Sequence, residues 1–355
     1  MSTICRPNIK TPEHRVTTEE LVQYIADEYR DHPRIEYVLN TIRATTVQAR
    51  RFSRPLEELA RPAKSTGERM REHFRDACRL AEEASRDALA SAQVGPQEID
   101  ALVCASFTGY VMPGMDIHLI GRLGLPATVR RTPVTQLGCA GGAFALTQAA
   151  EHIAAHPDDN VLVVCADVFT PFLHHTDAGM DAMIFRGILG DAAGACVVRG
   201  GTRGIGPVMA QSWQYVVPDS ADIVGIRLED DGFHGYNSLR LIKAVESALP
   251  HLSDWLRRTC PPEADPVPNF IIAHPGSPRV MDTLVSGLQC DASLLALSRA
   301  SLREMGNIGS VSLLDVLARV FIEPPASGAH GLVIGVGPGV TLVACRVGWS
   351  QGEGP

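Results

Sequence analysis

One cysteine lies in a segment whose local pattern suits a nucleophile. Cys139 lies between small residues in the segment from Gln136 to Ala143, directly before an alanine-rich stretch typical of a helix. The N-terminal end of a helix carries partial positive charge, so the pKa of a thiol there is expected to fall from ~8.5 to between ~3.5 and ~7.5. The segment predicts a reactive thiolate, with a buried cysteine in a tight turn as the alternative.

A histidine and an asparagine lie at the ends of predicted elements, where active sites form. His274 directly follows an apolar run, 269–273, and precedes a Pro-Gly pair. The carboxyl ends of parallel strands are where α/β enzymes bind their ligands. Asn307 lies in a glycine-flanked turn before a predicted helix. Each residue taken alone is also compatible with an ordinary turn or helix cap.

Together these residue types suit acyl transfer. A cysteine can accept an acyl group, and neutral His and Asn side chains can donate hydrogen bonds to an oxyanion or an enolate. Decarboxylative carbon–carbon bond formation requires such stabilisation of an enolate. A Cys-His-Asn protease uses the same residue types, so it is the rival interpretation at this level.

The elements predicted around these residues alternate between strands and helices, which indicates parallel βαβ units and an α/β fold. Short apolar runs predict strands at 99–106, 161–166, 269–273 and 331–335. Helical periodicity predicts helices at 67–93, 142–156, 238–258, 277–289 and 310–322.

The two halves of the chain are similar in sequence at one place. Segments 190–200 and 337–348 each have a glycine turn followed by an apolar strand with an Arg near its end. This similarity indicates an internal duplication, with chance as the alternative. The Gly- and Asp-rich stretch 199–231 is the best place for the boundary. We therefore divide the chain into 1–205, which carries the cysteine, and 206–355, which carries the histidine and the asparagine.

Composition excludes several classes of protein. At ~150 residues per domain, the 355 residues suit two domains or one large α/β unit. A net charge of −8 gives no support to nucleic-acid binding. Nine cysteines without a C-x-x-C pair argue against a disulfide framework and a zinc site, and the adjacent His174 and His175 have no further ligands at suitable spacing. We expect no metal.

Neither a membrane span nor a signal peptide is visible in the sequence. The longest apolar runs fall short of the ~20 residues that a membrane-spanning helix needs. The N-terminus has no basic segment followed by an apolar one. We therefore expect a cytoplasmic protein that does not insert into membranes.

Four motifs resemble, in order, those of the type III polyketide synthases, the chalcone synthase-like enzymes. They are Gly138–Gly142, Ala273–Gly276, Gly306–Ile308 and Gly335–Gly339. The likeness runs from about residue 35 to 348 and includes the segments 112–114 and 231–234. Ketoacyl synthase III enzymes, which condense acyl-coenzyme A with a carrier-protein thioester, share the Cys-His-Asn set and are the nearest alternative. A non-catalytic binding protein of the thiolase fold is a third interpretation.

The resemblance implies a thiolase-type fold with two duplicated αβαβα halves in a five-layer arrangement, and an obligate homodimer. It implies iterative condensation of malonyl-type coenzyme A extenders onto an acyl-coenzyme A starter, followed by cyclisation to a small pyrone or resorcinol. No cofactor is implied, because the coenzyme A thioesters are substrates. By position, Cys139 is the acyl-accepting nucleophile, and His274 and Asn307 bind the thioester oxygen during extender decarboxylation.

The resemblance also identifies residues of the substrate pocket. Phe233 matches one of two gatekeeper phenylalanines between the coenzyme A tunnel and the cavity, whereas the other gatekeeper position holds Leu189. Loss of that ring favours an aliphatic starter over coumaroyl. Met112 matches a residue that reaches into the cavity of the partner subunit, and Gly309 is expected to line the pocket.

One basic cluster falls where the family binds the phosphates of coenzyme A. It consists of Arg43, Arg50 and Arg51. We expect these residues to contact the phosphates, with solvated surface charge as the alternative.

Overall fold

A single large sheet forms the centre of the molecule. The computed structural model describes residues 1–60, 64–173, 176–201, 204–230, 232–260 and 266–351. The strands of the large sheet in this part of the chain are β1 (Ser2–Ile4), β2 (Asn8–Lys10), β5 (Ala101–Ala105), β6 (Arg130–Val134), β7 (Asn160–Asp167), β8 (Ala192–Gly200), β9 (Gly206–Val216), β12 (Phe270–Ala273), β13 (His330–Gly337) and β14 (Thr341–Ser350). Their order is β12-β13-β14-β9-β1-β8-β7-β5-β6, and β2 pairs with β8.

The two ends of this sheet repeat one pattern. In the first half, β5 runs parallel to β7, and β7 pairs antiparallel with β8. In the second half, β12 runs parallel to β13, and β13 pairs antiparallel with β14. The similar segments 190–200 and 337–348 therefore contain equivalent strands, β8 and β14. Strand β1 pairs with both β8 and β9 and so joins the halves.

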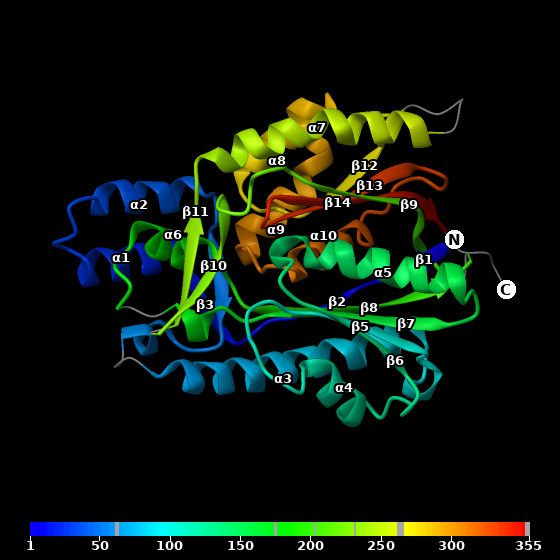
Figure 1. Ribbon diagram of the computed structural model, residues 1–355, viewed down its shortest axis with the longest axis horizontal. Helices are drawn as coiled ribbons and strands as arrows, with labels where there is room; N and C mark the ends of the chain where they lie inside the picture. Colours follow the sequence, from blue (N-terminus) through cyan, green and yellow to red (C-terminus); the bar gives the residue numbers. More distant parts are fainter. Residues whose placement is uncertain (61–63, 174–175, 202–203, 231, 261–265, 352–355) are drawn as a thin grey trace.

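The helices complete five layers, which are visible in Figure 1. Helices α3 (Thr66–Ala92) and α4 (Met115–Leu123) cover one outer face, and α7 (Arg240–Thr259) and α8 (Pro278–Leu288) cover the other. Between the two parts of the sheet lie α5 (Gly141–Ala155) and α10 (Val311–Val320), with α5 packed on strands of both halves. This arrangement agrees with the predicted α/β fold of duplicated halves.

The two central helices approach each other closely at their N-terminal ends. A Cβ at Gly142 would overlap the carbonyl oxygen of Ser310 and lie 3.3 Å from the Cβ of Leu313. Glycine is therefore required where α5 passes the start of α10. The largest apolar cluster surrounds this contact and draws residues from both halves, including buried alanines of α5 and leucines of α10.

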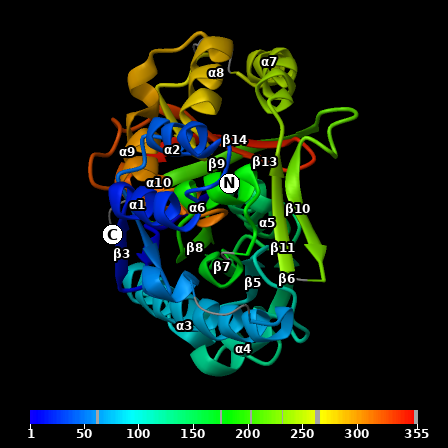
Figure 2. The same cartoon turned by 90° about the vertical axis from the view of Figure 1, so that its left-hand side faces the viewer.

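The remaining elements gather at one end of the layers, the end that faces the viewer in Figure 2. They include α1 (Thr18–Glu28), α2 (Ile35–Ala44), α6 (Met180–Ile188), α9 (Ala296–Met305) and two separate two-stranded sheets, β3 (His14–Thr17) with β4 (Ala49–Phe52) and β10 (Val224–Glu229) with β11 (Gly232–Asn237). Short 3-10 turns are Leu56–Ala60, Pro96–Glu98, Gly138–Ala140, Thr170–Phe172 and Ala292–Leu295.

All five helices and four strands predicted from the sequence are present within a few residues of their expected bounds. The stretch 199–231, expected to hold the boundary, contains β9 and β10. Strand β9 has several exposed residues in its second half, so it has no continuous apolar run. Within the described residues, we find no helix long and apolar enough to cross a membrane.

Candidate active site

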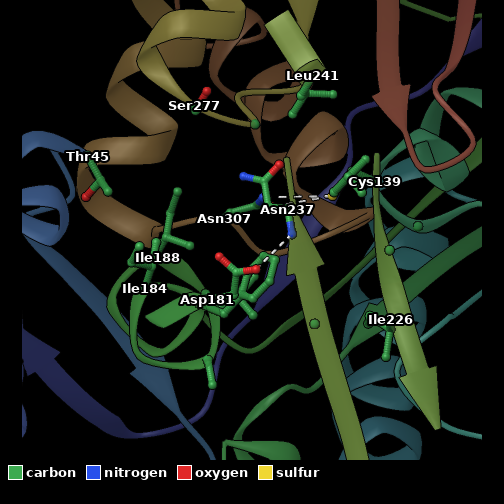
Figure 3. A pocket seen from close by; sticks show the side chains of 18 of the residues that line it. Thr45, Cys139, Asp181, Ile184, Ile188, Ile226, Asn237, Leu241, Ser277 and Asn307 are labelled. Atoms are coloured by element: carbon green, nitrogen blue, oxygen red, sulfur yellow. Dashed lines mark hydrogen bonds between the residues drawn. The ribbon is translucent and has the colours of Figure 1, made fainter. Parts of the chain in front are cut away.

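A cavity of about 860 Å³ opens where the two halves meet. Cys139, His274 and Asn307, which lie far apart in the sequence, all line it. Figure 3 shows Cys139 and Asn307 facing each other across this space. The fold therefore brings the three predicted catalytic residues into one cavity.

Cys139 and Asn307 lie at the starts of the two central helices. The Cys139 Sγ atom is 3.8 Å from Nδ2 and 3.9 Å from Oδ1 of Asn307. The backbone N–H of Gly309 donates to Oδ1 at 3.0 Å, so the oxygen is engaged and the amide NH2 is free to face the sulfur. The backbone of Asn307 is held between Ile188 and Gly190, with N–H···O distances of 2.7 and 3.0 Å.

His274 directly follows β12, as the sequence predicts. Its backbone N–H donates to the carbonyl of Ile334 at 2.9 Å and extends the pairing of β12 with β13. The imidazole is buried, and neither ring nitrogen has a hydrogen-bond partner among the described residues. Burial lowers the pKa of His274 to about 3, so the ring is neutral at physiological pH. A neutral ring offers one N–H donor and one lone pair to a molecule in the cavity.

The expected fall in the pKa of Cys139 is wrong. Burial raises the pKa of this thiol to about 12, although the contact with Asn307 works in the opposite direction. Transfer of a charge out of water is unfavourable, and this effect of burial exceeds that of the contact with Asn307. Before a substrate binds, the thiol of Cys139 and the imidazole of His274 are therefore both neutral.

A glycine allows the turn at Cys139 to fit under the loop after β13. Gly138 has a φ of +52°, and a Cβ there would lie 2.5 Å from Cδ of Pro338. Pro338 and Gly337 line the cavity together with Cys139. The two motifs recognised in the sequence are thus neighbours in space.

Phe233 and Leu189 both line the cavity, as expected. Phe233 packs edge-on against Phe172 at 4.6 Å and is stacked with Tyr110 at 5.8 Å between ring centroids. Leu189 forms an isolated β-bridge with Asn307. Neither Phe172 nor Tyr110 carries a sequence signal that would have assigned it to this site.

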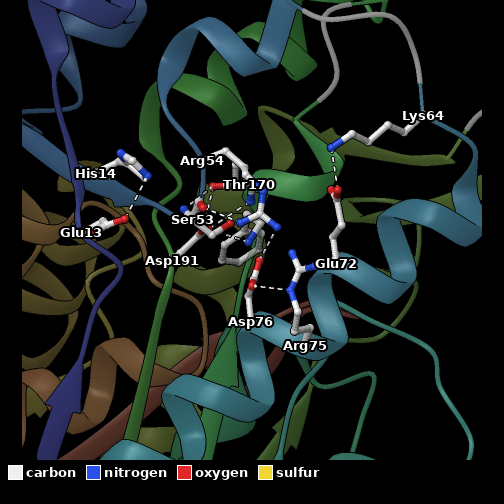
Figure 4. A network of polar contacts seen from close by, with 11 residues as sticks. Glu13, His14, Ser53, Arg54, Lys64, Glu72, Arg75, Asp76, Thr170 and Asp191 are labelled. Carbon is white, nitrogen blue, oxygen red and sulfur yellow. Dashed lines mark hydrogen bonds and ion pairs between the residues drawn. The ribbon is translucent and has the colours of Figure 1, made fainter.

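A buried carboxylate holds the segment that carries Leu189 in place. Figure 4 shows Asp191 among its donors. It accepts hydrogen bonds from the backbone of Phe169 at 2.7 Å, the hydroxyl of Thr170 at 2.5 Å and the backbone of Ser53 at 2.8 Å. Burial raises the pKa of Asp191, whereas these hydrogen bonds lower it.

Two predicted pocket residues do not line the cavity of this chain. Gly309 has a φ of +61°, and a Cβ there would lie 2.5 Å from Oδ2 of Asp167, so it lies behind the wall. Met112 is 96% exposed, on a loop whose neighbours Tyr110 and Val111 are also exposed. Asp231 of the matched segment and the adjacent His174 and His175 lie outside the described residues.

The predicted cluster of three arginines does not form. Arg50 is fully buried, where its guanidinium donates to Thr18 and to the carbonyl of Gly187, and burial lowers its pKa to about 10. A phosphate cannot reach it. Arg51, the next residue on β4, points to the other face of the strand and donates to the carbonyl of Glu13 at 2.8 Å.

Two other arginines, which the sequence analysis missed, are exposed and line the cavity. Arg34 lies over the ring of Tyr37 at 4.6 Å, and Arg279 lies in the first turn of α8. Arg43, by contrast, is 3.5 Å from Glu19. Within the described residues, no group of three or more His, Cys, Asp or Glu side chains could hold a metal ion.

Comparison with known proteins covers nearly the whole chain. Residues 7–202 match the family described as chalcone and stilbene synthases, N-terminal domain, and residues 208–347 match its C-terminal domain. The 1,3,6,8-tetrahydroxynaphthalene synthase of Streptomyces griseus is 35% identical over 99% of this chain and 94% of its own length. The phloroglucinol synthase of Pseudomonas fluorescens is 30% identical over 99% of this chain and 100% of its own.

A solved structure is also similar throughout. The crystal structure of 1,3,6,8-tetrahydroxynaphthalene synthase from Streptomyces coelicolor, a bacterial type III polyketide synthase, superimposes with a TM-score of 0.93. It is 31% identical, and the match covers 98% of this chain and 99% of the other.

Proposed function

Because the chain belongs to the chalcone and stilbene synthase family and is a type III polyketide synthase, we propose that Cys139 carries the growing acyl chain, while His274 and Asn307 stabilise the extender enolate. Enzymes of this family condense malonyl-coenzyme A units iteratively and cyclise the product; the thioesters are substrates, and no cofactor takes part. The observation that carries the proposed roles is the meeting of these three side chains in one cavity.

Loading of the starter begins from a neutral pair. The thiol of Cys139 attacks the thioester carbonyl of the starter, the carbon–sulfur bond to coenzyme A breaks, and the lone pair of His274 accepts the thiol proton. The proton then passes to the departing coenzyme A thiolate. Because burial raises the pKa of Cys139 and lowers that of His274, the charged pair forms only as the reaction proceeds.

Extension uses the same groups as donors. Malonyl-coenzyme A loses carbon dioxide, and the electron pair of the broken bond forms an enolate whose oxygen accepts hydrogen bonds from the ring N–H of His274 and from Nδ2 of Asn307. The enolate carbon attacks the acyl carbonyl on Cys139 and releases the thiolate. Neutral donors suit this step, since they stabilise the anion without protonating it.

We assign an aliphatic starter to the enzyme, with a small pyrone or resorcinol as product. Leu189 and the isoleucines of α6, Ile184 and Ile188, give part of the cavity an aliphatic wall. Each buried CH2 of a starter contributes ~0.8 kcal/mol on such a surface. An aromatic starter would lack the ring contact that a phenylalanine at position 189 would provide.

A second candidate product is favoured by the similar proteins. The names tetrahydroxynaphthalene synthase and phloroglucinol synthase denote polyhydroxylated aromatic products. Such products have no alkyl side chain, so no aliphatic starter is retained in them. The enzyme would then use malonyl-coenzyme A alone.

Mass spectrometry of the products separates the two candidates. The purified enzyme is incubated with malonyl-coenzyme A alone and with malonyl-coenzyme A plus octanoyl- or coumaroyl-coenzyme A. We expect an alkyl-substituted pyrone or resorcinol to dominate in the octanoyl reaction. A polyhydroxylated aromatic without a side chain, formed equally in all three reactions, would establish the second candidate instead.

We propose that Arg34 and Arg279 replace the predicted arginine cluster as ligands of the coenzyme A phosphates. Both are exposed cations that line the cavity, Arg34 directly before α2 and Arg279 in the first turn of α8. Arg34→Glu and Arg279→Glu should raise the KM for acyl-coenzyme A severalfold but leave the KM for an N-acetylcysteamine thioester, which has no phosphates, unchanged. Arg43→Glu is the matched control and should change neither.

We also propose a homodimer in which Met112 reaches into the cavity of the partner subunit. The exposed apolar loop of Tyr110, Val111 and Met112 supports this assignment. Met112→Lys should give a monomer in sedimentation experiments.

The proposed division of the chain at residues 205 and 206 is supported by the matched family ranges, which end at 202 and begin again at 208.

A further inference from the structure

Three buried polar side chains form a row of hydrogen bonds beside the cavity, which the middle one, Thr108, also lines. The row begins at His73 on α3, continues to Thr108 after β5, and ends at Asp167 on β7. Nε2 of His73 is 2.6 Å from Oγ1 of Thr108, which in turn lies 3.4 Å from Oδ1 of Asp167. The exposed fractions of the three residues are 4%, 3% and 0%. Neither the proposed reaction nor the sequence motifs account for this His73.

The direction of the hydrogen bonds along this row follows from the unpartnered atoms. Nδ1 of His73 has no partner among the described residues, and an orphaned N–H is more costly to bury than an orphaned lone pair. The proton therefore lies on Nε2, which donates to Thr108, and the hydroxyl of Thr108 must donate onward to Asp167. Burial lowers the pKa of His73 to about 4, so the ring stays neutral.

Asp167 connects these hydrogen bonds to the start of α10. Its Oδ2 accepts hydrogen bonds from the backbone N–H of Ser310 at 2.8 Å and from the Ser310 hydroxyl at 2.6 Å. The same carboxylate packs against the Cα of Gly309, where a side chain would not fit. The N–H of Gly309 is the donor that engages Oδ1 of Asn307 and leaves Nδ2 facing the sulfur of Cys139.

We propose that the row His73–Thr108–Asp167 positions the Asn307 amide for extender decarboxylation. The inference rests on the proposed function of Asn307 and adds three positioning residues to it. These residues act through Asn307 and do not themselves touch the reacting atoms. By donating to Thr108, His73 orients the hydroxyl together with the N–H of Val168, which lies 3.1 Å from the same oxygen. The hydroxyl then acts with the N–H of Phe107, 3.1 Å from Oδ1, to hold Asp167, and Asp167 holds the turn that orients Asn307. Loss of the first donor should therefore weaken decarboxylation without preventing acyl loading.

A purely structural role for His73 makes a different prediction. The ring of His73 is 5.6 Å from that of Phe172, which packs on the gatekeeper Phe233. If His73 only supports these rings, then a side chain of similar size would replace it, and any damage would appear in starter binding rather than in decarboxylation.

The test uses the full chain and two assays. Intact-protein mass spectrometry measures acylation of Cys139 by octanoyl-coenzyme A, and release of carbon dioxide measures decarboxylation of malonyl-coenzyme A. We expect His73→Leu to lower kcat for decarboxylation roughly tenfold, because small displacements of a positioned group have large effects on rate. Its KM and the loading rate should not change. His73→Gln, whose Nε2 can still donate to Thr108, should recover most of the rate.

A double variant shows whether His73 acts through Asn307. In the Asn307→Ala background, His73→Leu should produce no further loss of decarboxylation, since the group it positions is absent. An equal loss in both backgrounds, or full activity of His73→Leu, would overturn the inference. Thr108→Val provides the same comparison if His73→Leu does not fold, and Thr108→Ser should recover the rate.

Two controls separate this inference from the proposed function. His152→Leu removes a similar contact, the 2.8 Å pair of His152 and Asp159 near the end of α5, and should leave both assays unchanged. If the unaltered enzyme neither loads Cys139 nor decarboxylates malonyl-coenzyme A, the proposed function fails. If it does both and His73→Leu matches it, only the positioning inference fails.

Discussion

The starts of α5 and α10 occupy equivalent places in the two halves but differ in the group that they hold, a neutral thiol at α5 and a buried carboxylate at α10. Each helix follows a turn that ends at the cavity, and the two helices touch at Gly142 and Ser310. The start of α10 binds a buried carboxylate, because Asp167 accepts both the N–H and the hydroxyl of Ser310. The start of α5 holds a thiol, Cys139, whose raised pKa keeps it protonated.

The difference shows that the two duplicated halves can place a charged anchoring group at one helix start and a reactive neutral group at the other. Burial raises the pKa of Asp167 to about 6, while its hydrogen bonds to Ser310 and Phe107 favour the ionised form. A carboxylate with this many donors is a rigid anchor. Among the described residues the sulfur of Cys139 has a long contact with Asn307, and burial outweighs this contact, so the thiol is uncharged at neutral pH.

The largest expected effect comes from removing the reactive group at the start of α5. Cys139→Ala should abolish product formation, because the acyl chain has no other carrier. Incubation with octanoyl-coenzyme A followed by intact-protein mass spectrometry should show one adduct on the unaltered protein and none on the variant. Cys260→Ala, at the far end of α7, is the control and should keep the adduct. An adduct that persists in Cys139→Ala would contradict the assignment.

Removal of the donor at the start of α10 should have a smaller and more selective effect. Asn307→Ala is expected to reduce malonyl-coenzyme A decarboxylation by ~10²-fold, as loss of one oxyanion donor does. Loading of Cys139 should continue, because the thiol and His274 are unchanged. Carbon dioxide release and intact mass, measured on the same preparation, test both halves of this prediction. Equal loss of loading would point to a structural role for Asn307.

The contrast in charge also predicts a pH dependence. Iodoacetamide reacts with the thiolate, and the raised pKa of Cys139 means that the thiolate fraction grows about tenfold with each pH unit through pH 9. The rate of inactivation should therefore keep rising between pH 7 and pH 9 without a plateau, with Cys139→Ala protein as the blank for labelling. A rate that is already high and constant below pH 8 would indicate that the helix start stabilises the thiolate after all.

The smallest expected effect concerns Leu189, which bridges to Asn307 where the halves meet. With Leu189, kcat/KM should rise with the length of an aliphatic starter until the cavity is full, since each buried CH2 contributes ~0.8 kcal/mol. Leu189→Phe should narrow this preference severalfold toward shorter chains, and Leu189→Ile is the conservative control. Competition assays with mixed acyl-coenzyme A starters measure the profile. An unchanged profile would show that position 189 does not gate the cavity.

The sequence by itself determined the class of chemistry and the main strands and helices. The residue types at positions 139, 274 and 307, each beside glycine or proline at the end of an element, predicted acyl transfer before any contact was known. Apolar runs and helical periodicity predicted the main strands and helices, because these patterns depend on neighbours only a few residues away. The similar segments 190–200 and 337–348 indicated the duplication, because this similarity is also a pattern of residues close together in the sequence.

Only the tertiary structure decided which charges are buried and which groups meet. Arg50 and Arg51 are adjacent in sequence, but the packing of β4 buries one and leaves the other at the surface. Likewise, the helix start at Cys139 predicted a lowered pKa, and burial by the other half of the molecule raised it. The hydrogen bonds that connect His73, Thr108 and Asp167 join three segments far apart in the sequence, and no local sequence pattern predicts them. Burial and desolvation depend on contacts between residues far apart in the chain, so no local pattern can reveal them.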